Sequence, residues 1–209
     1  MQTHAKIKIL IADDHKMVRA GLAALLETEN DMTVVGQAEN GEEAVAKTLQ
    51  LNPDVIVMDL MMPVKDGVEA TVEIHQKSPQ VKIVILTTYG TSDGIAHALV
   101  SGATGAITKS ADNADLAKAI RRVFNGERSI AEEIQQQLET DPPIPDLTPR
   151  QKEILDSMIR GLSNKDIAKQ LGISDRSVDE HVEALLSKIG ASNRTEAVVI
   201  ALRKHLLKV

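Results

Sequence analysis

Cysteine and tryptophan are absent from this 209-residue sequence, and Tyr89 and Phe124 are its whole aromatic set. Without cysteine the chain can form neither a disulfide nor a thiolate metal site, and a cysteine nucleophile is excluded. The hydrophobic core must therefore be built from Ile, Leu, Val, Ala and Met. No apolar run approaches the roughly 20 residues that a membrane-spanning helix needs. The apolar start runs directly into two aspartates, unlike a signal peptide, so a cytoplasmic protein is expected.

Charge is distributed unevenly along the chain. Residues 143–209 contain eleven Lys and Arg against nine Asp and Glu, a net charge of +2. Residues 1–142 contain thirteen against twenty-one, a net charge of −8. The length suits two small domains that each bury a core. Parts of opposite charge indicate that these domains have different partners.

Strand-like and helix-like segments alternate through the first two-thirds of the chain. Apolar, β-branched stretches predict strands at 6–13, 32–38, 54–59, 82–88 and 105–109. Stretches with helical periodicity follow them, at 18–28, 40–51, 66–77, 92–102 and 113–126. Strands this apolar are covered on both faces. Five such units in series predict a doubly wound α/β domain, with a five-stranded parallel sheet, over residues 1–128.

The composition changes after this first domain. Segment 129–146 is polar and ends in three prolines, so it is predicted to be an extended interdomain linker. The remainder, 147–209, has helical periodicity throughout. Thr148 precedes a proline at one helix start, and Ser163 and Asp166 have capping-box spacing at the next. Two short helices joined by the turn LGIS predict a small all-α domain of four helices that contains a helix-turn-helix.

Ionisable and hydroxyl side chains fall at the expected carboxyl ends of four strands. Asp13 and Asp14 end the first strand, Asp59 ends the third, Thr87 ends the fourth and Lys109 ends the fifth. In a sheet of order 2-1-3-4-5 these ends are neighbours, so the five side chains are expected at one edge, where such sheets bind ligands. Carboxylates are ligands that Mg²⁺ prefers. A carboxylate beside Mg²⁺, a lysine and a hydroxyl suits phosphoryl transfer, which depends on positioning and charge neutralisation.

Two sets of motifs resemble known families. IADDH, VIVMDLMMPVKDG, VILTT and AITKS, in this order and spacing, resemble the receiver domain of two-component response regulators. LTPRQKEIL, GLSNKDIAKQLGIS, SVDEHV and LLSKIGASNRTEAV resemble the NarL/LuxR-type DNA-binding domain. Together the two resemblances cover nearly the whole chain apart from the linker. They imply a phosphorylation-controlled transcriptional regulator that acts with a sensor histidine kinase and promoter DNA.

The resemblance also implies a role for each residue of the acidic edge. Asp59 would accept the phosphoryl group, and Asp14 and Asp59 would bind Mg²⁺ directly. Asp13 would act largely through water, and the backbone carbonyl of Met61 would complete the protein's share of the metal shell. The chain would assist its own phosphorylation and dephosphorylation and would not be an enzyme in any wider sense.

One position departs from the receiver pattern. Many receivers carry an aromatic residue three positions before the lysine, where its rotation reports phosphorylation, and Ala106 stands there in this sequence. An aromatic switch at that position is therefore not expected. Thr87 can still move a loop, with Tyr89 as a nearby candidate reporter.

The expected recognition helix within 173–189 is unusually acidic. In relatives its start reads Thr-Val-Lys-x-His-Val, with the lysine reaching DNA, whereas Asp179 stands at the lysine position here. DNA affinity rests largely on neutralising phosphates, so carboxylates oppose it. Asp or Glu can nevertheless accept a hydrogen bond from cytosine N4. Three interpretations follow: a DNA-binding regulator with an unusual site, a protein-interaction module that no longer binds DNA, and a solvated acidic face with the true contacts elsewhere.

The first interpretation is preferred because the helix-turn-helix scaffold and its flanking cations are intact. The expected phosphate contacts are Lys165, Lys169, Arg176, Lys188 and Arg194. The expected contacts at the start of the recognition helix are Ser177, Asp179, Glu180, His181 and Glu183. The resemblance suggests that a homodimer forms on activation through the last helix, at Val198, Val199 and Leu202. The alternative is that these apolar residues pack on the first helix of the same domain. A dimer would present two recognition helices to paired half-sites.

Overall fold

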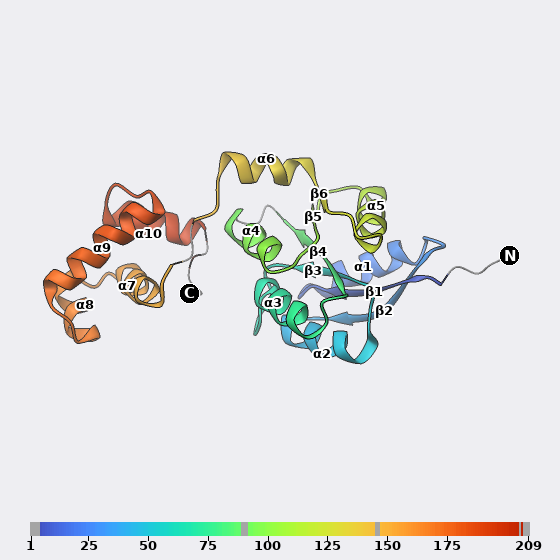
Figure 1. Ribbon diagram of the computed structural model, residues 1–209, viewed down its shortest axis with the longest axis horizontal. Helices are drawn as coiled ribbons and strands as arrows, with labels where there is room; N and C mark the ends of the chain where they lie inside the picture. Colours follow the sequence, from blue (N-terminus) through green and yellow to red (C-terminus); the bar gives the residue numbers. More distant parts are fainter. Residues whose placement is uncertain (1–4, 89–91, 145–146, 205, 207–209) are drawn as a thin grey trace. The chain divides into compact units, whose positions relative to one another are not determined.

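A parallel sheet organises the N-terminal part of the computed structural model, which describes residues 5–88, 92–144, 147–204 and 206 (Figure 1). Its strands are β1 (Ile7–Ala12), β2 (Met32–Ala38), β3 (Val55–Asp59), β4 (Lys82–Thr87), β5 (Gly105–Thr108) and β6 (Ser129–Ile130). They pair in the order β2-β1-β3-β4-β5-β6, each pair being parallel. The predicted fold class and the assumed strand order are confirmed, with β6 as an additional strand at one edge.

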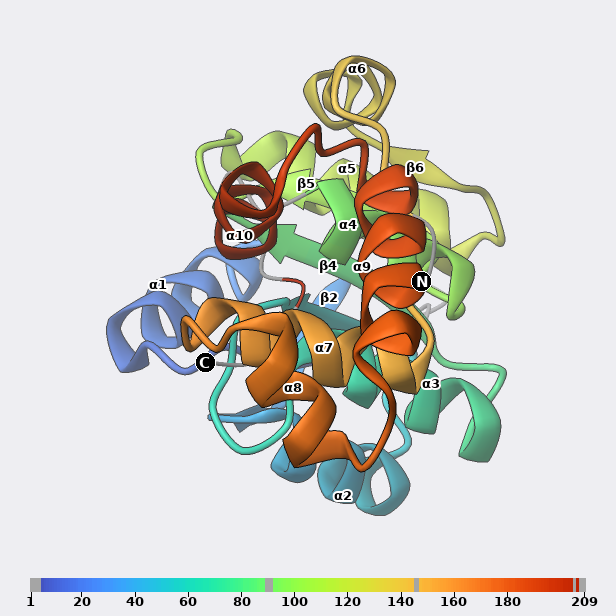
Figure 2. The same cartoon turned by 90° about the vertical axis from the view of Figure 1, so that its left-hand side faces the viewer.

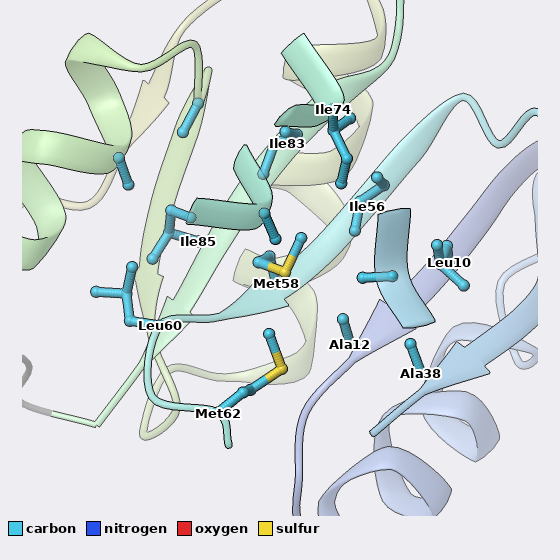
Figure 3. Close-up of a cluster of buried hydrophobic side chains, with 14 of the residues drawn as sticks. Leu10, Ala12, Ala38, Ile56, Met58, Leu60, Met62, Ile74, Ile83 and Ile85 are labelled. Carbon is cyan, nitrogen blue, oxygen red and sulfur yellow. The ribbon is translucent and has the colours of Figure 1, made fainter. Parts of the chain in front are cut away.

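Helices connect the strands and cover both faces of the sheet. They are α1 (Lys16–Leu26), α2 (Gly41–Leu51), α3 (Gly67–Lys77), α4 (Ser92–Val100) and α5 (Asn113–Phe124). Successive strand residues point to opposite faces. On β3, Ile56 and Met58 therefore join the cluster beside α2, α3 and α4, whereas Val55 and Val57 join the cluster beside α1 and α5. Figure 3 shows the first cluster, in which aliphatic and methionine side chains interlock without aromatic residues.

The polar segment after α5 packs onto the sheet instead of extending as a linker. Ile130 of β6 is paired with Ala106 of β5, which adds backbone hydrogen bonds to the sheet edge. The following helix, α6 (Glu132–Thr140), contacts α4 and β5. Ile134 on its inner face is fully buried in the same cluster as α4. This segment is therefore part of the N-terminal core.

The two compact units of the chain divide between Pro142 and Pro143. This division differs from the expected boundaries, in which the first domain ends at residue 128, a linker covers 129–146 and the second domain begins at residue 147. The physical reason is that β6 is very short and α6 is anchored mainly by one aliphatic side chain. Sequence composition over this segment is dominated by its exposed polar face.

Helices make up the described part of the C-terminal unit (Figure 2). They are α7 (Pro149–Ile159), α8 (Asn164–Leu171), α9 (Asp175–Ile189) and α10 (Arg194–Arg203). Thr148 and Ser163 cap α7 and α8 at the predicted positions, and Ser174 caps α9. Gly172 and Gly190 end α8 and α9 in the left-handed conformation. The side chains at the centre of this unit are fully buried: Ile154, Leu155, Ile167, Val178 and Leu185. Across the described ranges, no helix combines the length and the apolar character that a bilayer crossing requires.

Replacing Ile134 with alanine is expected to destabilise the N-terminal unit by about 2 kcal/mol or more, because the loss of a buried branched side chain removes apolar contact and leaves a cavity. Urea unfolding followed by circular dichroism measures the change. Glu139→Ala on the exposed side of α6 is the control, with an expected change within about 0.5 kcal/mol. Equal stability of the two variants would show that α6 does not belong to the folded unit.

Candidate functional site

The candidate site lies at the carboxyl edge of the sheet, where the parallel strands end together. Asp59 is the last residue of β3 and Thr87 the last residue of β4. Asp13 and Lys109 directly follow β1 and β5. Because β1, β3, β4 and β5 are successive neighbours in the sheet, these four residues lie at adjacent strand ends.

One ammonium group joins two buried carboxylates at this edge. The Lys109 Nζ atom lies 2.6 Å from Asp13 Oδ2 and 2.8 Å from Asp59 Oδ2. Asp13 is 1% exposed and Asp59 is 5% exposed. The backbone N–H of Lys109 donates to the carbonyl of Thr87 at 2.7 Å, which ties the start of the lysine side chain to β4. The structure thus holds two carboxylates out of water against a single positive charge.

Burial and hydrogen bonding together shift the pKa values of Asp59 and Lys109. Burial raises the pKa of the Asp59 carboxyl above its ordinary value, although the hydrogen bond from Lys109 acts in the opposite direction. Burial lowers the pKa of Lys109, but its hydrogen bonds to Asp13 and Asp59 outweigh that effect and raise it. Lys109 therefore remains a fixed positive charge beside Asp59. Such a charge can stabilise an anionic group brought to the same edge.

Asp14 lies at the outer, more exposed side of the site. Its Oδ1 atom is 2.6 Å from His15 Nδ1, and its side chain is 32% exposed. The backbone N–H of His15 donates to Asp13 Oδ1 at 2.8 Å. One ligand atom each from Asp13, Asp14 and His15 lies within 4.8 Å of the others, and Lys109 links this group to Asp59. His15 directly follows the two aspartates in the sequence, and this adjacency is the signal that could have placed it at the site.

The loop after β3 folds back over the end of that strand. The backbone of Met61 acts to lower the pKa of the Asp59 carboxyl, against the larger effect of burial, and the Gly67 N–H donates to the carbonyl of Leu60 at 2.9 Å. A Cβ atom on Gly67 would lie 2.1 Å from the Asp59 carbonyl oxygen. Asp66 closes a capping box at the start of α3 immediately before this glycine. The motif PVKDG thus fixes the peptide of Asp59 through close backbone packing.

Small side chains, those of Thr87 and Ala106, lie on the side of the site formed by β4 and β5. Thr87 is 2% exposed, and its Oγ1 atom donates to the carbonyl of Thr88 at 3.1 Å. Ala106 is buried on β5. Tyr89, the candidate reporter, lies outside the described residues. No role for Tyr89 follows from the structure.

A second candidate surface is the exposed face of α9 in the C-terminal unit. Arg176 Nε donates to Glu180 Oε1 at 3.1 Å, and both side chains are exposed. Glu183 is exposed on the same helix, and Ser177 and His181 are half-buried. The acidic side chains that the sequence placed on this helix are therefore exposed on the surface of α9.

The cations expected to contact phosphate have different surroundings. Lys165 and Lys169 are exposed on α8, whereas the Lys188 Nζ atom lies 3.4 Å from Gln151 Oε1. Arg194 donates through Nη2 to the carbonyl of Leu162. Lys165, Lys169 and Arg176 are thus the exposed cations of the expected set, whereas Lys188 and Arg194 are half-buried.

Asp179 takes part in a contact that sequence reasoning missed. Its Oδ1 atom accepts from Asn164 Nδ2 at 2.8 Å, and Asn164 Oδ1 accepts from Arg194 Nη1 at 3.0 Å. Asn164 is the first residue of α8 and Arg194 is the first residue of α10. These positions are distant in the sequence, so no local pattern signals their meeting.

Comparison with known proteins identifies both units. The protein-family model described as "Response regulator receiver domain" matches residues 9–121. The protein-family model described as "Bacterial regulatory proteins, luxR family" matches residues 145–201. The transcriptional regulatory protein LiaR of Bacillus subtilis is 38% identical over 209 residues, which cover 96% of this chain and 99% of that protein.

Solved structures agree with these matches. The crystal structure of the response regulator ChrA of a heme-sensing two-component system is 34% identical, with a TM-score of 0.59, and the match covers 98% of this chain and 100% of ChrA. RcsB of Salmonella enterica serovar Typhimurium, solved on a promoter with the phosphomimetic BeF3−, is 25% identical, with a TM-score of 0.70 and coverage of 93% of this chain and 97% of RcsB.

The chain therefore belongs to the response regulators, and within them to those that pair a receiver domain with a LuxR-type DNA-binding domain. Transcription regulation under phosphorylation control is typical of this family.

Replacing Gly67 with alanine is expected to lower the free energy of unfolding by about 1–3 kcal/mol, because the added methyl group meets the Asp59 backbone and forces it to shift. Gly21→Ala in α1 is the matched control, since a Cβ atom there meets nothing within 4 Å. The control is expected to gain about 0.5–1 kcal/mol from reduced backbone entropy. Urea unfolding of both variants measures the difference, and changes of the same sign would refute the packing argument.

Proposed function

We propose that this chain accepts a phosphoryl group on Asp59 and that the phosphorylated form binds promoter DNA as a dimer through its C-terminal unit. The observation that carries the proposal is the Lys109 ammonium 2.8 Å from the buried Asp59 carboxylate. This pair lies at the carboxyl edge of the sheet, inside the part of the chain that matches the receiver model. A transferred phosphoryl group would therefore meet a fixed positive charge.

The chemistry of the acidic edge fits a divalent cation. Asp13 and Asp59 pair with Lys109 and Asp14 lies close to Asp13, so three carboxylates meet one ammonium group and the local charge is negative. Carboxylate oxygens are ligands that Mg²⁺ prefers. Asp14 and Asp59 would hold the ion directly and Asp13 through water, with the backbone carbonyl of Met61 as a further ligand. When bound, Mg²⁺ would neutralise charge on the phosphoryl oxygens.

The transfer needs positioning more than covalent assistance from the protein. One carboxylate oxygen of Asp59 would attack phosphorus in the phosphohistidine of a sensor histidine kinase, or in a small acyl phosphate. An oxygen–phosphorus bond forms while the bond from phosphorus to the donor breaks, and its electron pair leaves with the donor. Lys109 and the Thr87 hydroxyl would then stabilise the new phosphoryl oxygens.

Contacts within the N-terminal unit connect this site to the domain boundary. Thr87 ends β4, and the next described element, α4, begins at Ser92. The Ser92 Oγ atom donates to Asp141 Oδ2 at 2.7 Å. Asp141 follows α6 and directly precedes the prolines at which the two units divide. A movement of α4 on phosphorylation would thus change the anchoring of α6 and shift an existing equilibrium.

The DNA-binding part of the proposal rests on exposed groups of the C-terminal unit. Lys165 and Lys169 are exposed on α8 and available for contact with phosphates. Val199 is 58% exposed and Leu202 is 47% exposed on α10, which together with the half-buried Val198 supports a dimer contact. The promoter complex of RcsB supports the same use of this domain. A regulator that meets both a kinase domain and chromosomal DNA would work in the cytoplasm.

Asp59→Asn is expected to abolish phosphate incorporation, because the amide oxygen is too weak a nucleophile to form the acyl phosphate. The purified full-length chain is incubated with radiolabelled acetyl phosphate and Mg²⁺, and the label is tested for release by hydroxylamine. Addition of EDTA to the unsubstituted chain is also expected to reduce incorporation to background.

Asp54→Asn is the matched control for this experiment. Asp54 precedes β3, whereas Asp59 ends it, and Asp54 accepts a hydrogen bond from the Lys8 N–H at 2.8 Å, which an asparagine oxygen can also accept. The control should be labelled like the unsubstituted chain. Persistent hydroxylamine-sensitive label in Asp59→Asn would contradict the assignment of the acceptor.

Ser92→Ala is expected to loosen α6, because the Asp141 carboxylate loses a hydrogen bond with a net contribution of about 1 kcal/mol. Hydrogen exchange of the α6 amides should become about fivefold faster. The difference in DNA affinity between the phosphorylated and unphosphorylated chains should also narrow. Ser101→Ala, beyond the other end of α4, is the control, and unchanged exchange in α6 for both variants would rule out this connection.

A further inference from the structure

A hydrogen-bonded bridge joins three helices of the C-terminal unit at the position where the sequence departs from its relatives. The bridge, called here the Asp179 bridge, consists of Asp179 on α9, Asn164 on α8 and Arg194 on α10. The Asn164 side chain stands at its centre. Its amide nitrogen donates to Asp179 Oδ1 at 2.8 Å, and its oxygen accepts from Arg194 Nη1 at 3.0 Å.

The bridge fixes the amino-terminal end of α8. The turn containing Gly172 joins the opposite end of α8 to α9, so that the two helices are connected at both ends of α8. Arg194 extends the connection, because its Nη2 atom also donates to the carbonyl of Leu162 in the segment before α8. The angle between α8 and α9 therefore depends on side-chain hydrogen bonds as well as on the core beneath them.

The bridge also changes the effect that the Asp179 carboxylate is expected to have on DNA binding. A carboxylate that faced a phosphate without a partner would oppose DNA binding. The Asp179 carboxylate is instead engaged by an amide whose other end is held by a guanidinium. Its negative charge is thus connected to a positive charge within the same unit, and one of its acceptor oxygens is already in use.

We propose that Asp179 is a positioning residue for DNA recognition, which acts through Asn164 and Arg194 and does not read a base itself. The bridge sets the orientation of α9 relative to α8, whose exposed lysines meet phosphates, and in this way compensates for the missing cation at position 179. This inference rests on the proposed DNA-binding function. It differs from the cytosine-reading role that the sequence suggested for Asp179.

The test combines three variants of the full-length phosphorylated chain with a double-mutant cycle. Asp179→Ala and Asn164→Ala are each expected to weaken DNA binding about fivefold to tenfold, as expected from the loss of one charge-assisted hydrogen bond. The double variant should be no weaker than either single variant, because both substitutions break the same bridge. Asp179→Asn keeps an oxygen acceptor for Asn164 and should restore binding to within about twofold of the unsubstituted chain.

Asp156→Ala is the matched control for charge. Asp156 is an exposed carboxylate on α7, outside the expected DNA contacts and outside the Asp179 bridge. Its removal takes away the same charge and should leave binding within about twofold of the unsubstituted chain. Binding is measured by fluorescence anisotropy on a set of promoter fragments in which each base pair is varied in turn. Loss of the bridge should weaken binding to all fragments alike, a readout that removal of a base contact would not give.

Three results would overturn the inference. If Asp179→Ala binds DNA more tightly than the unsubstituted chain, as the loss of a purely repulsive charge would cause, positioning is excluded. A loss of preference at one base pair alone in Asp179→Ala would assign base reading to the residue. Additive losses in the double variant would show that the two side chains act separately. A urea-unfolding cycle with the same variants measures their coupling without DNA.

The DNA-free cycle separates this inference from the proposed function. If the unsubstituted phosphorylated chain binds no promoter fragment at low salt, the proposed function falls and the positioning role falls with it, even where the unfolding cycle shows coupling. If the unsubstituted chain binds DNA but the unfolding cycle shows no coupling between Asn164 and Asp179, the inference alone is overturned.

Discussion

The contact of Lys109 with two buried carboxylates is the interaction on which the N-terminal unit depends. Asp13 and Asp59 lie almost entirely out of water, and a buried charge is costly unless it is paired and hydrogen-bonded. Lys109 supplies the partner because β5 ends beside β4, which ends beside β3. The pairing leaves the edge with excess negative charge, which suits a divalent cation. The same lysine can then face an incoming phosphoryl group, so one contact serves both the stability of the fold and its proposed chemistry.

The C-terminal unit also holds a carboxylate by hydrogen bonds from another element, in this case on its surface. Asp179 stands where the resemblance to the NarL/LuxR-type domain leads one to expect a lysine. Its carboxylate accepts a hydrogen bond from Asn164, which in turn accepts one from Arg194. In both units a carboxylate is satisfied by a donor that another element supplies. The acidic appearance of α9 in the sequence is therefore an incomplete guide to its role. Side-chain charge affects DNA binding through the groups that surround it as well as through its sign.

Sequence patterns predicted the sheet, its flanking helices and the helix-turn-helix because those patterns report burial directly. Apolar β-branched runs become strands covered on both faces, and Ser163 and Gly172 mark the ends of α8 by local backbone chemistry. The segment containing β6 and α6 was wrongly predicted to be a linker because sequence patterns report burial and most of its residues are exposed. Its polar composition reports the exposed face, whereas the inner face of α6 consists of the fully buried Ile134 and the half-buried Leu138, one i,i+4 pair in a short helix.

The sequence by itself determined the fold class, the order of the domains and the residue types at the carboxyl edge, because these follow from hydrophobic periodicity and from positions at strand ends. The tertiary structure decided which groups meet. It placed Lys109 between Asp13 and Asp59, brought Asn164 to Asp179, and connected Ser92 to Asp141 at the domain boundary. These contacts join residues from different elements. Their geometry depends on how whole helices and strands pack, which no local pattern in the chain encodes.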